Sequence, residues 1–551
     1  MPSTALDRAR LALARIEAVD RPEIWIGLRS RAEVEEEARA VDARVAAGAR
    51  LPLAGKLFAA KGNIDVAGLP TTAGCPSYAY APEADAPAVA RLRAAGAVLL
   101  GTTNLDQFAT GLVGTRSPYG AVRNALDPAR ISGGSSSGSA VAVALGLVDL
   151  ALGTDTAGSG RIPAAFNGIV GLKPTRGLVP TTGVVPACAS LDCVTVFART
   201  LPEAEQALAH LMSPSGRDLP PLPRRTPGPW RVAAPPAAQL GDLDEGWAAA
   251  FEETLALLRA AGADVRTLDL TPFTEAAAML YEGAFVAERY AAVGSFVDKL
   301  IADGGDGLDP TVAGIITRAR DIPAHRLFAD QERLAGLRGR ALTELGDADA
   351  LLLPTAPGHP TLDEVAADPL GANARLGRFT NSTNLFDLAA VAVPGGEVAG
   401  LPFGVMLIGP AFTDERLATI ARLVQPPLRI AVVGAHLSGE PLNPQLLALG
   451  AEYERTTTTA PVYRLHALAT TPPKPGLVHV GAGGAAIEAE VWRLPAEGLG
   501  RLVAALPRPM TLGRVELADG GHVPGFLCEP AALADAADIT AHGGWRAYRN
   551  R

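Results

Sequence analysis

Two hydrophobic patterns alternate along most of the chain. From residue 51 to about 200, short apolar or β-branched runs such as 148–156 end in polar residues and are separated by runs typical of helices. Residues 245–345 carry a largely helical pattern, and buried strands return at 348–360 and 391–410. This order predicts an α/β fold, in which a rigid sheet positions the polar loops at the ends of its strands.

The two ends of the chain differ from this middle part. The first 50 residues are rich in Arg, Glu and Ala and predict helices, whereas 214–235 is a Pro- and Arg-rich surface connection. Residues 425–427 (Gln-Pro-Pro) predict a hinge, since consecutive prolines interrupt regular structure. Short strands with Gly/Pro turns follow the hinge. We therefore expect a large domain at 1–425 and a small α+β domain at 428–551.

Composition narrows the class of protein. The 551 residues are 48% apolar and 19% charged, which provides for a large core, and the net charge of −9 argues against nucleic acid as a partner. The most apolar stretch, 139–153, is shorter than the roughly 20 residues of a membrane span. The four cysteines show neither metal-ligand spacing nor a disulfide framework, and no targeting segment is evident. These features predict a cytoplasmic protein with reduced cysteines, without a membrane partner.

Candidate chemistry gathers in two Gly/Ser-rich loops and at one lysine. Ser135 lies in the loop GGSSSGS and Ser159 in the loop GTDTAGSGR, while Lys61 follows the apolar run 57–60. A serine hydroxyl needs a positioned base to act as a nucleophile, and lysine can be that base only where burial keeps its amine neutral. The first histidine, His210, comes after both loops. The pattern predicts amide hydrolysis by two serines and a lysine.

Other interpretations of the same residues are open at this level. Lys61 could be an ordinary surface lysine at a strand end, and a run of glycines and serines could form a linker or a phosphate-binding loop. A phosphate-binding loop would need GxxxxGK[ST], but Ser139 is followed by Ala-Val-Ala. A linker is disfavoured because apolar runs adjoin both ends of the loop.

Together, Lys61, GGSSSGS and GTDTAGSGRIPAAFNGIVGLKPTRG resemble the amidase signature family over roughly 1–425. The resemblance implies a large mixed central sheet flanked by helices, with no cofactor and no metal. It also implies that Ser159 is the nucleophile, that Ser135 relays the proton, and that Lys61 is the base. The peptide bond that precedes Ser135 is expected to be cis. The backbone N–H groups of Thr156, Ala157, Gly158 and Ser159 would form the oxyanion hole. One departure is Gly62, where the family usually has aspartate.

Further segments resemble the allophanate hydrolase branch of this family. These are AGSGR, SSSGS, GVVPACASLDCVTVFA and LYEGAFVAERY. Allophanate is a small planar anion, and the resemblance implies that Tyr281 and Arg289 hold it. Eight residues turn a helix by about 80° beyond two revolutions, so both side chains could face one pocket from a single helix. Alternatively, Arg289 forms a surface salt bridge beside Glu288. Arg161 is a second candidate cation or a brace for its loop.

The C-terminal part resembles the accessory domain of allophanate hydrolases, whose fold is like that of gamma-glutamylcyclotransferases. GAHLSGEPLNPQL, TAPVYRLHAL and IEAEVWRLP carry the resemblance. It associates the domain with a decarboxylation step, for which His436 and Glu490 are the candidates. His436 could instead be an ordinary loop histidine. The resemblance also suggests that the first 50 residues pair two subunits in a homodimer.

The predicted reaction is attack by Ser159 on the amide of allophanate, which releases ammonia and N-carboxycarbamate and then carbon dioxide and a second ammonia. The alternatives are a broad-specificity amidase of the same family, an amidotransferase subunit that acts on aminoacyl-tRNA, and an inactive scaffold. No Met-Lys-Met biotin-attachment site occurs. Allophanate would therefore come from a separate urea carboxylase or from biuret breakdown, and the sequence leaves both routes open.

Overall fold

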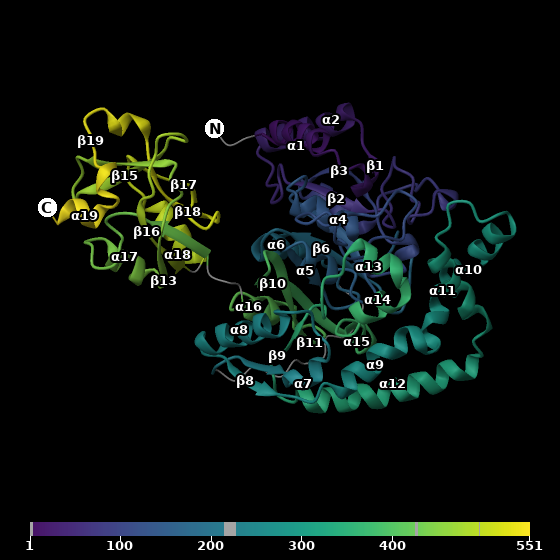
Figure 1. Ribbon diagram of the computed structural model, residues 1–551. Helices are drawn as coiled ribbons and strands as arrows, with labels where there is room; N and C mark the ends of the chain where they lie inside the picture. The colour runs from purple at the N-terminus through teal and green to yellow at the C-terminus, as the bar shows by residue number, and fades with distance from the viewer. Residues whose placement is uncertain (1–3, 214–227, 425–427, 495, 551) are drawn as a thin grey trace. The chain divides into compact units, whose positions relative to one another are not determined.

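The computed structural model describes residues 4–213, 228–424, 428–494 and 496–550 (Figure 1). Its internal contacts divide the chain into two compact units, Met1–Gln425 and Pro426–Arg551. The expected hinge at 425–427 and most of the expected connection at 214–235 lie outside the described residues.

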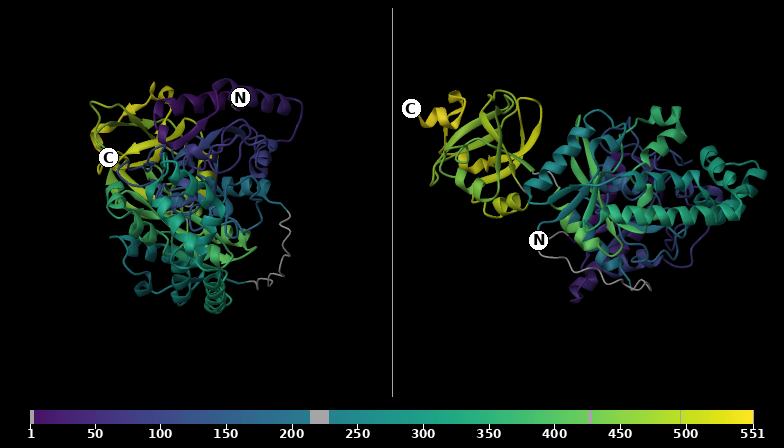
Figure 2. Two further views of the ribbon diagram at one scale, coloured as in Figure 1. Left: turned by 90° about the vertical axis from the view of Figure 1, so that its right-hand side faces the viewer. Right: turned by 90° about the horizontal axis from the view of Figure 1, so that it is seen from below.

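An eleven-stranded mixed sheet forms the centre of the first unit, and helices surround it (Figures 1 and 2). The strand order is β1-β3-β2-β4-β6-β5-β10-β11-β9-β7-β8. This architecture confirms the predicted fold class. The strands are β1 (Trp25–Leu28), β2 (Leu57–Lys61), β3 (Val98–Thr103), β4 (Leu150–Asp155), β5 (Val170–Lys173), β6 (Cys193–Ala198), β7 (Arg231–Ala234), β8 (Asp264–Thr267), β9 (Ala350–Pro354), β10 (Leu388–Val398) and β11 (Leu401–Pro410).

The middle of this sheet explains where polar groups collect. β2 pairs in parallel with both β3 and β4, and every residue of these three strands is buried. Burial on both faces accounts for their nearly continuous apolar sequences. Because the three strands run in one direction, their carboxyl ends meet at one edge of the sheet. Lys61, Thr103 and Asp155 are the last residues of these strands, so polar side chains meet at that edge.

The first two helices of the first unit begin where the sequence provides caps. Thr4 with Asp7 and Ser30 with Glu33 form capping boxes on the first two helices. The helices are α1 (Ala5–Val19), α2 (Arg31–Ala46), α3 (Pro87–Ala94), α4 (Ser137–Ala144), α5 (Ile162–Phe166), α6 (Leu201–Leu211), α7 (Ala237–Leu240), α8 (Trp247–Ala260), α9 (Thr271–Glu282), α10 (Ala287–Ala302), α11 (Pro310–Arg318), α12 (Ala324–Leu345), α13 (Leu362–Ala367), α14 (Pro369–Leu376), α15 (Asn381–Leu385) and α16 (Asp414–Ala421).

The second unit contains two small antiparallel or mixed sheets with its own apolar core. A five-stranded sheet has the order β13-β16-β12-β18-β17, and a three-stranded sheet has the order β15-β14-β19. The buried side chains of Trp492, Leu465 and Phe526 belong to one cluster between these elements. The elements are β12 (Leu428–Val432), α17 (Asn443–Ala448), β13 (Glu452–Thr458), β14 (Tyr463–Leu468), β15 (Lys474–His479), β16 (Glu488–Leu494), α18 (Ala496–Ala504), β17 (Met510–Glu516), β18 (His522–Cys528), β19 (Ala537–Asp538) and α19 (Trp545–Arg549).

Across the part of the chain that the structure describes, no helix combines the length and the apolar character that a membrane span requires.

Candidate active site

Lys61, Ser135 and Ser159 come from three neighbouring segments at the edge of the sheet described above. Lys61 ends β2, Ser135 lies in the loop that leads into α4, and Ser159 lies in the turn between β4 and α5. The Lys61 Nζ donates to Ser135 Oγ at 2.7 Å and to Thr154 Oγ1 at 2.7 Å. The peptide bond between Gly134 and Ser135 is cis. The base and the relay that the sequence suggested are thus in direct contact.

The surroundings of Lys61 favour its neutral form. Burial, with a smaller contribution from the charge of Arg289, lowers the pKa of its amine from 10.5 to about 7. The carboxylates of Asp106, Asp192 and Asp155 act in the opposite direction. An amine with a pKa near 7 is unprotonated in about half of the molecules at neutral pH, so it can accept a proton from a serine hydroxyl.

Ser159 is buried, and the backbone of its turn is held by the carboxylate of Asp155. Asp155 accepts hydrogen bonds from the backbone N–H of Gly158 and of Gly160, both at 2.9 Å. Within the described residues, no hydrogen bond joins the hydroxyls of Ser159 and Ser135. Catalytic hydrogen bonds are often long without substrate and shorten when it binds. The turn therefore fixes the backbone of Ser159 and leaves its hydroxyl without a hydrogen-bond partner among the described residues.

The backbone donors of this turn differ from the predicted set of four. The N–H of Gly158 already donates to Asp155 Oδ1, so in this arrangement it does not point at a substrate oxygen. Among the described residues, the N–H groups of Thr156, Ala157 and Ser159 have no recorded partner. Gly158 serves a different need, because a Cβ at this position would lie 2.4 Å from Thr380 Oγ1.

Arg161 acts as a brace. Its guanidinium is fully buried and forms an ion pair with Asp155, with Nε to Oδ2 at 3.0 Å. Nη1 donates to the backbone oxygen of Thr380, and both Nη atoms reach side chains of α15. With its charge neutralised and its donors engaged, Arg161 ties the turn that carries Ser159 to α15. Of the two roles considered from the sequence, the structure favours the brace over the substrate cation.

Tyr281 and Arg289 meet, but they do not share the single helix that the spacing suggested. Tyr281 lies in α9, Arg289 lies in α10, and a 3-10 turn (Ala284–Val286) separates the two helices. At Gly283 a Cβ would lie 2.6 Å from the carbonyl oxygen of Met279. Even so, Arg289 Nη2 donates to Tyr281 Oη at 3.0 Å.

The environment of Arg289 also differs from a surface salt bridge. Its side chain is 1% exposed, and the neighbouring Glu288 instead accepts hydrogen bonds from Ser190. Within the described chain, no carboxylate forms an ion pair with Arg289. Arg289 is therefore a buried cation without an acidic partner.

Sequence reasoning missed several polar groups of the site. Thr154 accepts the second hydrogen bond of Lys61, and Asp192 accepts one from Thr156 Oγ1. Burial raises the pKa of Asp192 to about 6. The signal for Thr154 was its place at the end of a buried strand beside β2. Asp192 had no such signal, because its loop folds back on the site only in three dimensions.

The unusual Gly62 has a steric explanation. A Cβ at this position would lie 2.6 Å from Ile26 Cδ1 and 3.0 Å from the carbonyl oxygen of Thr103. The position has no room for the aspartate that the family usually carries. The backbone N–H of Gly62 donates to Thr103 at 2.9 Å, so the loop is held by main-chain bonds.

A cavity of about 490 Å³ in the second unit includes His436, Gln445 and Lys474 in its lining. The His436 ring stacks on Phe526 with 4.8 Å between ring centroids. Burial lowers the pKa of His436 to about 4, and the charge of Lys474 adds to this effect. Gln445 Oε1 lies 3.4 Å from His436 Nε2.

Glu490, the other candidate in this unit, is held in place by hydrogen bonds from neighbouring side chains. It is buried, and its carboxylate accepts hydrogen bonds from Ser438, Trp492 and Arg546. Burial alone would raise the pKa of Glu490, but these bonds together lower it. It does not line the cavity around His436.

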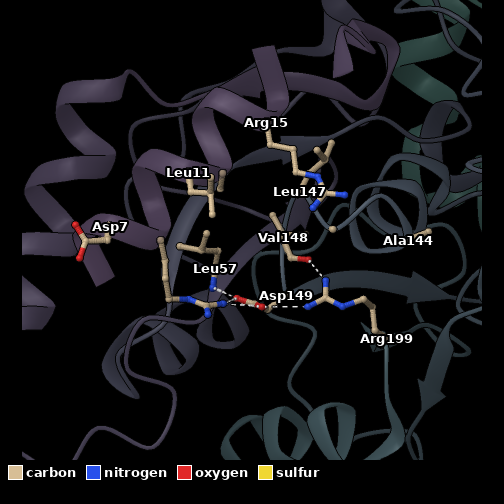
Figure 3. Close-up of a pocket in the computed structure, with 12 residues that line it drawn as sticks. Asp7, Leu11, Arg15, Leu57, Ala144, Leu147, Val148, Asp149 and Arg199 are labelled. Carbon is tan, nitrogen blue, oxygen red and sulfur yellow. Dashed lines mark hydrogen bonds and ion pairs between the residues drawn. The ribbon is translucent and has the colours of Figure 1, made fainter. Parts of the chain in front are cut away.

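A separate cavity of about 440 Å³ lies between α1 and the carboxyl end of α4 (Figure 3). Its floor holds Asp149, which forms ion pairs with Arg8 and Arg199. The loop that carries Ser135 precedes the other end of α4, so this cavity is separate from the site of Lys61, Ser135 and Ser159.

Comparison with known proteins places this geometry in a family. Residues 8–418 match the model described as "Amidase", which covers well over half of the chain. The chain belongs to the amidase family. Residues 428–550 match the model "Allophanate hydrolase C-terminal domain". The family resemblance of the two parts, expected from their motifs, is confirmed.

Individual relatives agree with these assignments. A urea amidolyase of Saccharomyces cerevisiae is 41% identical over 90% of this chain, and a urea amidolyase of Lachancea kluyveri is 41% identical over 95%. The chain spans about a third of the length of these two relatives, 30% and 31%. A solved Kluyveromyces lactis allophanate hydrolase is 39% identical, with a TM-score of 0.71; the match covers 100% of this chain and 97% of that one.

Proposed function

We propose that this chain is an allophanate hydrolase. One observation carries the proposal: a lysine whose lowered pKa makes its amine available as a base contacts the relay serine, and the same site contains a buried arginine without an acidic partner. Lys61 contacts Ser135 at 2.7 Å, and Arg289 is close enough for its charge to lower the pKa of Lys61. Amide chemistry and anion recognition thus belong to one site. The similarity to the solved allophanate hydrolase supports the same substrate.

The first step breaks the terminal amide of allophanate. Lys61 takes the proton of Ser135 while Ser135 takes the proton of Ser159, and the Ser159 oxygen bonds to the carbonyl carbon. The N–H groups of the nucleophile turn stabilise the negative charge on the carbonyl oxygen. The carbon–nitrogen bond then breaks, and ammonia leaves with a proton returned through Ser135. Water attacks the acyl-enzyme by the same relay and releases N-carboxycarbamate.

Arg289 binds the carboxylate that the reaction leaves unchanged. Transferring a guanidinium out of water is costly unless an anion compensates its charge. Here the substrate carboxylate is that anion, and Tyr281 adds a hydroxyl beside it. A neutral amide of similar size would leave the cation uncompensated and bind more weakly. This distinguishes the proposal from a broad-specificity amidase.

We assign the second step to the C-terminal unit. N-carboxycarbamate takes up one proton and loses carbon dioxide to give carbamate, which takes up another and yields ammonia and carbon dioxide. His436, in its cavity beside the Lys474 amine, is the candidate proton donor. A bound dianion would raise the low pKa of the imidazole and so favour the protonated form that can donate. Glu490, held by three partners, stabilises the loop of Ser438.

The proposal extends to the source of the substrate and to the setting of the protein. Allophanate comes from urea carboxylation or from biuret breakdown, and the chain acts in the cytoplasm as a homodimer paired through its first 50 residues. Nucleic acid and membranes are not partners.

Ammonia release tests the proposal. Purified wild-type protein should release ammonia from allophanate and malonamate much faster than from a neutral aryl amide. Ser159→Ala should lower this rate at least about a thousandfold, because no other hydroxyl can form the acyl-enzyme. Ser136→Ala is the matched control, since its hydroxyl donates to the backbone oxygen of Thr154 and takes no part in the relay. Activity of Ser159→Ala within tenfold of wild type would refute the assignment.

A further inference from the structure

Thr110 and Tyr281 each contact one terminal nitrogen of the Arg289 guanidinium, Thr110 at Nη1 and Tyr281 at Nη2. Thr110 follows the 3-10 helix Gln107–Ala109 and is 1% exposed. Its Oγ1 accepts a hydrogen bond from Arg289 Nη1 at 3.0 Å and donates one to the backbone oxygen of Phe108 at 3.2 Å. The direction of the hydroxyl is therefore set, with its lone pair on the arginine.

The backbone around Thr110 is held on both sides. Its N–H donates to the carbonyl of Gln107 at 3.0 Å, and its own carbonyl accepts from Arg116 Nη1 at 3.1 Å. The two preceding residues, Phe108 and Ala109, both have a φ of 51°, a conformation that side-chain-bearing residues seldom adopt. Such a turn is unfavourable locally, so the surrounding contacts must impose it. They present Thr110 to Arg289 in one orientation.

Counting donors shows what these contacts leave unused. A guanidinium has five N–H bonds. Within the described residues, one is given to Thr110 and one to Tyr281, so 5 − 2 = 3 remain. One of these is on Nε, which is buried and has no partner. The guanidinium is thus oriented at two nitrogen atoms, while three of its donors make no hydrogen bond to the described residues.

Both of the groups that orient Arg289 are neutral hydroxyls. A carboxylate at either place would hold the guanidinium more strongly, but it would also neutralise it and compete with an anionic ligand. The pair Asp155–Arg161 shows that combination in the same protein. Hydroxyl acceptors fix the geometry and preserve the positive charge.

We infer that Thr110 is a positioning residue that sets the preference of the site for anionic amides by aiming the Arg289 guanidinium at the substrate carboxylate. This inference rests on the proposed function, because it needs Arg289 to bind that carboxylate. Thr110 itself does not act on the reacting atoms. Removal of the Thr110 hydroxyl should therefore raise KM for anionic substrates more than it changes kcat. It should leave kcat/KM for neutral substrates unchanged.

The test compares malonamate, which carries a carboxylate, with malonamide, which does not. Thr110→Val keeps the shape of the side chain and removes the hydroxyl. We expect its KM for malonamate to rise about tenfold with kcat within threefold of wild type, and kcat/KM for malonamide to stay within twofold. Thr110→Ser restores the hydroxyl and should return KM to within threefold of wild type. Thermal unfolding of each variant checks that the fold is intact.

A double-mutant cycle shows whether Thr110 acts through Arg289. In the Arg289→Met background, Thr110→Val should change the ratio of kcat/KM for malonamate to that for malonamide by less than twofold, because no guanidinium remains to aim. An additive tenfold effect in that background would overturn the inference, as would an unchanged ratio in Thr110→Val alone. If Arg289→Met alone leaves the ratio unchanged, the proposed function fails instead, so the two failures are distinguishable.

Discussion

Arg161 and Arg289 are both fully buried arginines of the catalytic unit, and they have opposite surroundings. Arg161 forms an ion pair with Asp155 and bonds further to α15, whereas Arg289 is held by the hydroxyls of Thr110 and Tyr281. The first is neutralised by the protein, and the second keeps its charge. The comparison shows that the type of partner, more than burial or position near the nucleophile, separates a structural arginine from one that can bind an anion.

The largest difference should appear in stability. Arg161→Met would leave Asp155 buried with its main cationic partner removed, and we expect a loss of about 3–5 kcal/mol in the free energy of unfolding. Arg289→Met removes a buried charge that has no acidic partner, so it should change the free energy by about 1 kcal/mol or less. Urea denaturation of both variants measures the difference. Equal losses would mean that the two arginines do not differ in the way described.

Arg289→Met, which should affect stability less than Arg161→Met, should have the larger effect on substrate preference. Arg289→Met should lower kcat/KM for malonamate by about a hundredfold, because charge-assisted hydrogen bonds to the carboxylate are lost. Its kcat/KM for malonamide should stay within about threefold. Steady-state ammonia release with both substrates gives the ratio. An equal fall for the two substrates would place Arg289 in the structure of the site and outside anion recognition.

The smallest expected effect is a shift in pH dependence. With the pKa of Lys61 near 7, kcat/KM should fall tenfold per pH unit below that value, as the amine becomes protonated. The positive charge of Arg289 contributes to this low pKa, so Arg289→Met should raise the pKa of Lys61 and move the acid limb to higher pH. A pH profile with malonamide, which does not need Arg289, measures the shift. Movement to lower pH would contradict the assigned electrostatics.

Much of the fold followed from pattern alone. The apolar runs ending in polar residues became β2, β3 and β4, because strands buried on both faces must be apolar nearly throughout. The helical pattern of 245–345 also holds, apart from the short edge strand β8. The break between α9 and α10 was not foreseen, since helical spacing continues through Gly283 and the obstacle is a contact with Met279.

The site was partly within reach of the sequence. Motif resemblance located Lys61, Ser135 and Ser159, and the structure places the first two in contact. The roles of Gly158 and Arg161 depend on Asp155. Its carboxylate accepts hydrogen bonds from the backbone N–H of Gly158 and from the guanidinium of Arg161. Sequence spacing cannot say which of several donors a buried carboxylate will take, because that depends on the three-dimensional path of the turn.

The break at Gly283 has a consequence for engineering. Because Tyr281 and Arg289 lie on two separate helices, and Thr110 lies on a loop, the groups that we propose for recognition of the carboxylate come from other segments than Lys61, Ser135 and Ser159. Libraries randomised at these three positions could retarget the enzyme toward other small amides, and changes at Arg289 would at the same time raise the pKa of Lys61.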